Sequence, residues 1–278
     1  MPNLCTQINK LFKLPVHPFN LNNEGKKTYQ EWQYEKGVDT LTFYLKHNTI
    51  TDMFKGKKVL DIGCGAAGKT VFYASKGVEN IIGIEILNKY KYDAEELAKK
   101  YRVNDKFTFV CSDASKTPFD NDSFDTIIMN DAMEHVDEPE KVLEECYRIL
   151  KKDGKVYLNF PPYNHPYGAH LSDAIGIPWV HIFFNEKTLI NTYKELVNSL
   201  PDGRERIEFR IGTKENKSEY FSYINKMTIK RFQNIIKNSE FYIEYYKEEP
   251  LRKEVNYLAK LPLCKEYLVK MVVCVLKK

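Results

Sequence analysis

Side chains that can accept hydrogen bonds close successive apolar runs of the sequence. Asp61 lies near the end of the first run, Glu85 and Asp113 close the second and third, and Asn130 closes the fourth. Parallel strands present their carboxyl ends at one edge of a sheet, where ligands bind beside the point at which strand order reverses. Carboxylates there accept hydrogen bonds and favour a positive charge. The sequence therefore predicts one crevice for a ligand that contains an adenosine and a cation.

A glycine-rich turn follows Asp61. Gly63, Gly65 and Gly68 form a G-x-G-x-x-G pattern between an apolar run and a helix, which permits a tight turn and close approach of a ligand to the main chain. Asp61 is unfavourable beside a pyrophosphate but suits a cationic ligand. Glu85 follows Gly68 by 17 residues and can accept both hydroxyls of a ribose. The alternative is that the glycines serve only close helix packing.

The elements that position these residues alternate regularly. Continuous apolar runs separated by amphipathic helices predict a parallel sheet with helices on both faces, an α/β doubly wound fold. A later pair of runs predicts an antiparallel C-terminal edge, which brings the sheet to seven strands. The predicted strands are 58–63, 80–86, 106–112, 124–129, 155–160, 241–246 and 268–276, and the predicted core helices are 70–75, 89–101, a helix over 139–152 that stops at Gly154, and 228–239.

The combined pattern resembles a known family, the class I S-adenosylmethionine-dependent methyltransferases, and in particular their methyltransferase-11-like branch acting on small molecules. The resemblance covers about residues 57–162 and implies a Rossmann-like fold. It rests on Asp61-Ile62-Gly63-Cys64-Gly65-Ala66-Ala67-Gly68, Glu85, Ser112-Asp113-Ala114, Ser123-Phe124-Asp125 and Asn130-Asp131-Ala132-Met133-Glu134-His135-Val136.

This resemblance implies S-adenosyl-L-methionine as the cofactor and a role for each matching position. Asp61, Gly63 and Gly65 would hold the methionine end, Glu85 the ribose, Asp113 and Ala114 the adenine, and Asn130 the amino group or sulfonium side.

Histidines and aromatic residues provide candidates for the acceptor side. His135 follows the fourth strand and is the expected general base, although a histidine there can equally cap a helix or bond the main chain. The segment after the fifth strand is expected to line a substrate pocket, with plain packing as the alternative. Its histidine spacings of five and eleven match no common ligand pattern, so no metal is expected. The residues are Tyr163, His165, Tyr167, His170, Trp179 and His181.

Composition limits the partners. There are 42 Lys and Arg against 38 Asp and Glu, a net charge of +4, without the basic stripe of a nucleic-acid binder. The six cysteines form no C-x-x-C pair and suit a reducing cytoplasm. Apolar runs are too short to span a bilayer, and no N-terminal apolar run of signal-peptide length occurs. We therefore expect a cytoplasmic protein with no membrane or nucleic-acid partner, and the sequence leaves its oligomeric state open.

Four segments are expected: an N-terminal cap (1–56), a cofactor-binding core (57–162), a substrate lid inserted after the fifth strand (163–224) and the C-terminal completion of the sheet (225–278). The leading hypothesis is methyl transfer by in-line displacement to a small or medium-sized acceptor. The alternatives are a methyltransferase acting on tRNA or protein, and a non-catalytic module that binds S-adenosylmethionine. A nicotinamide oxidoreductase ranks last because Asp61 and Asp113 have no place in it.

Overall fold

The chain folds into two compact units, and the computed structural model describes residues 3–278. We call them the Rossmann unit and the accessory unit. The Rossmann unit contains Thr28–Phe160, Ile229–Glu249 and Met271–Lys278. The accessory unit contains the described residues up to Lys27, together with Pro161–Thr228 and Pro250–Lys270. The expected N-terminal segment 1–56 is thus divided at Lys27, and its first two residues lie outside the described part of the chain.

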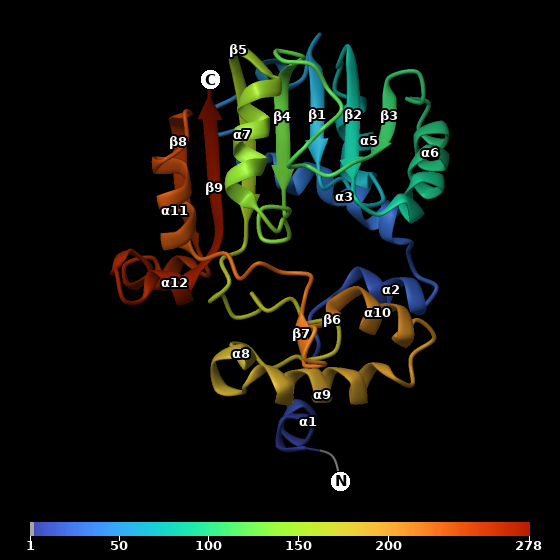
Figure 1. Ribbon diagram of the computed structural model, residues 1–278, viewed down its shortest axis with the longest axis vertical. Coiled ribbons are helices and arrows are strands. Elements are labelled where there is room, and N and C mark those ends of the chain that lie inside the picture. Colours follow the sequence, from blue (N-terminus) through green and yellow to red (C-terminus); the bar gives the residue numbers. More distant parts are fainter. Residues whose placement is uncertain (1–2) are drawn as a thin grey trace. The chain divides into compact units, whose positions relative to one another are not determined.

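One seven-stranded sheet forms the centre of the Rossmann unit (Figure 1), in the order β3-β2-β1-β4-β5-β9-β8. Strands β1 to β5 are parallel, and β9 pairs antiparallel with β5. This confirms the predicted doubly wound α/β fold with its antiparallel C-terminal edge. Strand order reverses between β1 and β4. The strands are β1 (Lys58–Ile62), β2 (Asn80–Glu85), β3 (Phe107–Cys111), β4 (Phe124–Asn130), β5 (Leu150–Phe160), β8 (Tyr242–Pro250) and β9 (Val269–Lys277).

Helices cover both faces of this sheet. Figure 1 shows α7 in front of the strands and α3 and α5 behind them. Buried apolar residues of α5 and α6 form a common core with β1 to β3. The helical elements of this unit are α3 (Tyr29–Leu41), α4 (Ile50–Met53), α5 (Gly68–Ala74), η1 (Asn88–Tyr90), α6 (Lys91–Lys100), α7 (Pro139–Ile149) and α11 (Ile229–Lys237).

The predicted end of the helix that begins at Pro139 was wrong. Helix α7 ends at Ile149, and Leu150 already belongs to β5, where it pairs with Phe124. Gly154 lies inside this strand and does not cap the helix. A Cβ atom at Gly154 would lie 2.7 Å from Cγ of Leu150, so the glycine is required for close packing within the irregular start of the strand.

The accessory unit has its own buried core, which includes Cys5, Leu171, Tyr193 and Phe221. The start of this unit contains two short helices, whose first turns are capped by the side chains of Asn3 and His17. The elements are α1 (Leu4–Asn9), α2 (Pro18–Asn23), α8 (Val180–Phe183), α9 (Glu186–Val197), α10 (Gly203–Arg210), β6 (Ile211–Thr213), β7 (Glu219–Phe221), η2 (Lys253–Val255), η3 (Leu258–Lys260) and α12 (Lys265–Leu268).

A buried ionic cluster fixes α10 within the accessory unit. The carboxylate of Asp173 lies 3.0 Å from Nη1 of Arg206 and 3.1 Å from Nη2 of Arg210. The Tyr193 hydroxyl donates to Oδ2 of the same carboxylate at 2.7 Å. The three charged side chains are almost fully buried. Their mutual pairing offsets the cost of removing them from water.

Helix α3 packs directly on the first turn of α5. A Cβ atom at Gly68 would lie 2.1 Å from the carbonyl oxygen of Gln30 and 2.7 Å from the main-chain nitrogen of Tyr34. Neither main-chain atom can move without displacing α3. Gly68 is therefore needed for close packing of α3 on α5. At this one position, the alternative explanation of the glycine pattern applies.

We expect Gly68→Ala to lower the free energy of unfolding by about 1 to 3 kcal/mol, the usual cost of overpacking. Urea denaturation followed by circular dichroism measures the change. Glu95→Ala on the surface of α6 is the control, with an expected effect within about 0.5 kcal/mol. Equal stability of Gly68→Ala and the parent chain would contradict the packing described for α3.

Within residues 3–278, none of the helices combines the length and the apolar character needed to cross a bilayer.

Candidate functional site

The glycine loop (residues 63–68) leaves the carboxyl end of β1 at the reversal of strand order. Gly63 and Gly65 adopt positive φ angles of 69° and 55°, a conformation that favours glycine. A Cβ atom at Gly63 would also lie 2.8 Å from Cβ of Ala132, in the loop after β4. The two glycines therefore let the main chain turn where a side chain would not fit.

Glu85 ties the glycine loop to the end of β2. Its Oε2 atom accepts a hydrogen bond from the main-chain N–H of Gly65 at 3.0 Å, and Oε1 accepts one from Leu87 at 3.1 Å. Each carboxylate oxygen keeps a second acceptor position. Glu85 can thus hold the loop in place and still accept the two hydroxyls of a ribose.

A cavity of about 220 Å³ opens at the carboxyl edge of the sheet. Carboxylates from several different loops surround it, so its walls favour a positively charged occupant. It brings together five of the residues predicted for the site. The lining residues are Ile62, Gly63, Ile84, Glu85, Ile86, Ser112, Asp113, Ala114, Ser115, Ala132, His135, Val136, Asp137, Glu138 and Val142.

Asp113 and Ala114 belong to the loop after β3, which forms one part of the cavity wall. The Asp113 carboxylate accepts a hydrogen bond from the main-chain N–H of Ser115 at 2.7 Å, which closes the turn and fixes the side chain. Apolar side chains of Ile86 and Val142 line the same cavity. The combination offers a flat aromatic ring both apolar contact and a polar edge.

Asp61 lies at the back of the glycine loop rather than on the cavity wall. Its side chain is buried, and Oδ2 accepts a hydrogen bond from the Thr70 hydroxyl at 2.5 Å. Burial raises the pKa of Asp61 to about 6, although the Thr70 hydrogen bond and the charge of Lys69 oppose the shift. Within residues 3–278, no Lys, Arg or His side chain forms an ion pair with Asp61, so the charge of its carboxylate is not balanced by direct contact.

Asn130 has its side-chain atoms committed inside the core. The amide oxygen accepts hydrogen bonds from the Tyr44 hydroxyl at 2.5 Å and from Asn159 at 2.6 Å, and the amide nitrogen donates to Tyr73 at 3.1 Å. This buried network joins β4, β5 and α5. The structure thus gives the Asn130 side chain a structural role and does not bring it to the cavity. The contact of Asn130 with the cofactor stays a prediction, and it would have to be made by the main chain.

Helix α3 and an ion pair add contacts that sequence reasoning did not identify. Gln33 accepts a hydrogen bond from the Gly68 N–H at 3.3 Å and donates one to the Tyr29 hydroxyl at 3.1 Å. Lys69, in the first turn of α5, pairs with Asp131 at 2.6 Å and so links α5 to the loop after β4. A Thr28–Glu31 capping box marks the start of α3 in the sequence, but nothing in the sequence indicates that α3 packs against the glycine loop.

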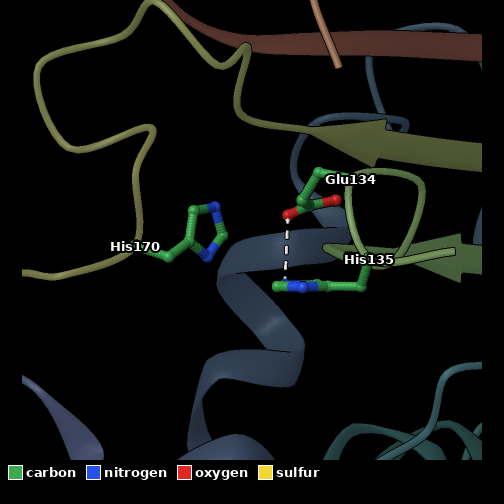
Figure 2. Close-up of side chains that lie close together, drawn as sticks. All are labelled: Glu134, His135 and His170. Atoms are coloured by element: carbon green, nitrogen blue, oxygen red, sulfur yellow. Dashed lines mark ion pairs between the residues drawn. The ribbon is translucent and has the colours of Figure 1, made fainter. Parts of the chain in front are cut away.

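His135 lies on the loop that follows β4 and lines the cavity. Figure 2 shows its ring beside the Glu134 carboxylate, with 3.8 Å between Nε2 of His135 and Oε1 of Glu134. Burial, and then the negative charge of Asp131, raise the pKa of Glu134 well above its usual value. His135 is about one-third exposed, so its ring can reach a ligand in the cavity while Glu134 limits its orientation.

The six residues predicted to bind substrate all belong to the accessory unit. The rings of Tyr163 and His181 lie 4.7 Å apart, and those of His165 and Tyr167 lie 6.3 Å apart. Burial lowers the pKa values of His165 and His181 to about 4, so both imidazoles are neutral at pH 7.

The other two of these residues have left-handed main-chain conformations. Trp179 and His170 have φ angles of 55° and 53°. Residues with bulky side chains rarely adopt such angles, so the surrounding packing must hold them there. The indole N–H of Trp179 is buried and, among the described residues, has no hydrogen-bond partner. This orphaned donor is the feature of the segment most suited to a polar ligand.

Comparison with known proteins agrees with the geometry of the Rossmann unit. Residues 60–158 match the model of a family described as a methyltransferase domain. By this match, residues 60–158 form a methyltransferase domain, similar to those of the class I S-adenosylmethionine-dependent methyltransferases. The match begins within β1 and ends within β5, and it includes the glycine loop, Glu85 and His135. The cofactor of this family is S-adenosyl-L-methionine, as the sequence predicted.

Two relatives illustrate the range of proteins that share this methyltransferase core. One is 24-methylenesterol C-methyltransferase 2 of Arabidopsis thaliana, 36% identical over 106 residues, which are 38% of this chain and 29% of that protein. The other is the ubiquinone biosynthesis O-methyltransferase of Coxiella burnetii, 28% identical over 126 residues, which are 45% of this chain and 52% of that protein. The chain thus spans about half or less of these relatives.

Among solved structures, a SAM-dependent methyltransferase from Methanosarcina mazei is similar with a TM-score of 0.52 and 20% sequence identity. The similarity covers 82% of this chain and 95% of the other. At this identity the likeness concerns the fold, and it extends well beyond residues 60–158.

The described residues of the Rossmann unit fit S-adenosyl-L-methionine. The Glu85 carboxylate lines the cavity and can accept hydrogen bonds from hydroxyl groups, and the main chain at Gly63 lines the same cavity. Asp61 is a buried carboxylate with a raised pKa, which a nearby ammonium group would lower. These are the features required by a ligand that carries a nucleoside at one end and an amino acid at the other.

Proposed function

We propose that this methyltransferase transfers a methyl group from S-adenosyl-L-methionine to a small or medium-sized acceptor. The observation that carries the proposal is the cavity at the strand-order reversal, which Gly63, Glu85, Asp113, Ala114 and His135 line together. S-adenosyl-L-methionine, when bound, supplies an electrophilic methyl group that a nucleophile displaces directly. The protein then contributes chiefly by holding the reactants in line.

In this proposal, the Rossmann unit binds the cofactor through residues of separate loops. Glu85 accepts the ribose hydroxyls, Asp113 and Ala114 bind the adenine, and Asp61 with the main chain of the glycine loop holds the methionine end. The hydrogen bond from Gly65 to Glu85 supports this arrangement because it fixes the loop before the ligand arrives. Preorganisation of this kind reduces the ordering cost of binding.

His135 is the proposed general base for an acceptor with an acidic O–H or N–H. It lines the cavity, and its neighbour Glu134 is buried. Glu134 is a positioning residue that limits the movement of the imidazole at 3.8 Å. The base accepts the proton that the acceptor loses as its lone pair attacks the methyl carbon.

For the acceptor, we propose contacts from the accessory unit, whose Tyr163–His181 segment carries neutral imidazoles and the orphaned indole N–H of Trp179. Aromatic rings and neutral imidazoles of this kind suit an acceptor with aromatic or aliphatic parts. The names of the two relatives above refer to a sterol and to ubiquinone biosynthesis, and both sterols and ubiquinone have this character. All six cysteines are free thiols, which supports a cytoplasmic location for the proposed reaction.

The decisive experiment is an acceptor screen that measures released S-adenosylhomocysteine. We expect turnover with at least one small hydroxyl, amine or carbon acceptor. Binding of the cofactor without product from any acceptor, including tRNA and protein, would support a non-catalytic module. Product only from tRNA or protein would replace the small-molecule proposal.

The raised pKa of Asp61 predicts a pH-dependent affinity for the cofactor. Below pH 6 the carboxyl gains a proton and loses the charge that attracts an ammonium group, so affinity falls as the pH falls. We expect calorimetry with S-adenosylhomocysteine to show about tenfold weaker binding at pH 5 than at pH 7, because only about a tenth of the carboxyl is ionised one unit below its pKa. Asp61→Asn should bind weakly without this pH dependence. The same slope in both proteins would remove Asp61 from the site.

A further inference from the structure

A segment of the accessory unit exposes an unusual number of large apolar side chains. The β8–β9 connection (residues 251–268) leaves the sheet after β8 and returns at β9, and a hydrogen bond from the Leu251 N–H to the Leu268 carbonyl oxygen, 2.8 Å long, closes its base. Leu263 is 88% exposed and Tyr257 is 77% exposed. The exposed apolar residues of the connection are Tyr257, Leu258, Leu261, Leu263 and Tyr267.

Only Ala259 of the connection is buried. Short turns replace longer elements here, with η2 and η3 followed by the single turn of α12. The connection therefore contributes little to the core, although it contains several leucines and tyrosines. Exposed leucines and tyrosines this close together in one short segment indicate a surface that binds a partner.

Positive charge accompanies these apolar side chains. The connection contains four basic residues (Arg252, Lys253, Lys260 and Lys265) and two acidic residues (Glu254 and Glu266). Arg252, Lys253 and Lys260 are exposed, and no ion pair with a carboxylate involves them within residues 3–278. The connection therefore combines apolar contact area with uncompensated positive charge.

We propose that the β8–β9 connection binds the surface of a membrane that contains anionic lipids. Leucines enter the boundary between headgroups and acyl chains, tyrosines lie at the same depth, and the basic side chains contact lipid phosphates. A second copy of this chain fits less well, because a basic surface that meets itself across a two-fold axis repels. A nucleic acid would use the basic side chains and leave the leucines without a partner.

This proposal departs from the sequence-based expectation of no membrane partner. That expectation rested on the length of apolar runs, which tests whether a chain spans a bilayer. Binding at a membrane surface needs no such run. It needs exposed apolar residues next to basic ones, and the connection has both. It is also independent of the proposed methyl transfer, since it concerns residues 251–268, which the proposed function does not use, and is measured without cofactor or acceptor.

The test is co-sedimentation of the full chain with vesicles of phosphatidylcholine alone and of phosphatidylcholine mixed with phosphatidylglycerol. We expect binding to the mixed vesicles that weakens as salt is raised. Tyr257→Ser/Leu263→Ser should weaken it by roughly tenfold or more, and Lys253→Glu/Lys260→Glu should do the same. Matched controls are Tyr92→Ser/Tyr242→Ser, which removes two tyrosines 72% and 77% exposed in the Rossmann unit, and Lys237→Glu on α11. These controls should bind like the parent chain.

Several results would overturn the proposal. Absence of the parent chain from both vesicle pellets would do so, as would equal loss of binding in the patch variants and the matched controls. Vesicle binding that neither double substitution in the connection weakens would place the contact elsewhere on the chain. Light scattering provides a separate check: a dimer that Tyr257→Ser/Leu263→Ser dissociates, without vesicle binding, would assign this surface to a second copy.

Discussion

His135→Ala should lower turnover by about a hundredfold or more while leaving cofactor affinity within about threefold of the parent value, because general base catalysis contributes about 10² to 10⁴ in rate. His135 lines the cavity beside Glu134, and its ring is partly exposed. Removing the imidazole takes away the proton acceptor but leaves Glu85 and the glycine loop in place. Steady-state release of S-adenosylhomocysteine and calorimetric cofactor binding measure the two quantities separately.

His135→Gln separates the proton-transfer role from packing, since the amide fills similar space but cannot accept a proton near neutral pH. We expect it to remain as slow as His135→Ala. His47→Ala, at an exposed position after α3, is the matched control and should keep full turnover. Equal losses of turnover and cofactor affinity in His135→Ala would show that the ring supports the binding site rather than the chemistry.

Glu85→Ala should weaken cofactor binding by at least tenfold, because a charged acceptor contributes about 1.5 to 3 kcal/mol. Two effects add in the same direction. The ribose hydroxyls lose their acceptor, and the main-chain N–H groups of Gly65 and Leu87 lose the carboxylate that holds them. Calorimetric titration with S-adenosylhomocysteine gives the dissociation constant directly.

Glu85→Gln tests which of the two effects is larger. The amide oxygen can keep one of the two main-chain hydrogen bonds, but the amide nitrogen faces a donor at the other. We expect an affinity between those of the parent chain and the alanine variant. Glu96→Ala, on the solvent side of α6, controls for the loss of a surface carboxylate. Unchanged affinity in Glu85→Ala would remove the ribose assignment and the site built around it.

The sequence predicts the Rossmann unit well because its signals are local. Each parallel strand is a short apolar run followed by a turn, and Gly63 and Gly65 occupy the left-handed positions that such a turn requires. Glu85 and Asp113 meet at one cavity because parallel strands end at one edge. The end of α7 was mistaken because Gly154 is a common helix terminator, whereas its packing against Leu150 depends on contacts within β5 that no local pattern shows.

Long-range contacts account for what the sequence does not reveal. Asn130 lies at the end of a strand, where a residue that contacts a ligand is expected. However, Tyr44 and Asn159, from distant segments, donate hydrogen bonds to its side-chain amide oxygen. Gln33 reaches Gly68 only because α3 returns over the loop. The apolar and basic residues of the β8–β9 connection were visible in the sequence, but their exposure became evident only once the core was complete without them.

The chain passes between its two compact units five times. As a result, the span recognised as a methyltransferase domain cannot be excised as an independent protein. A fragment cut to residues 60–158 would lack β9, so the polar main-chain groups along the outer side of β5 would have no partner. Such an open strand invites pairing with other chains, and the fragment would also lack α3 over its glycine loop. Insoluble aggregates, rather than a minimal enzyme, are the expected product of that truncation.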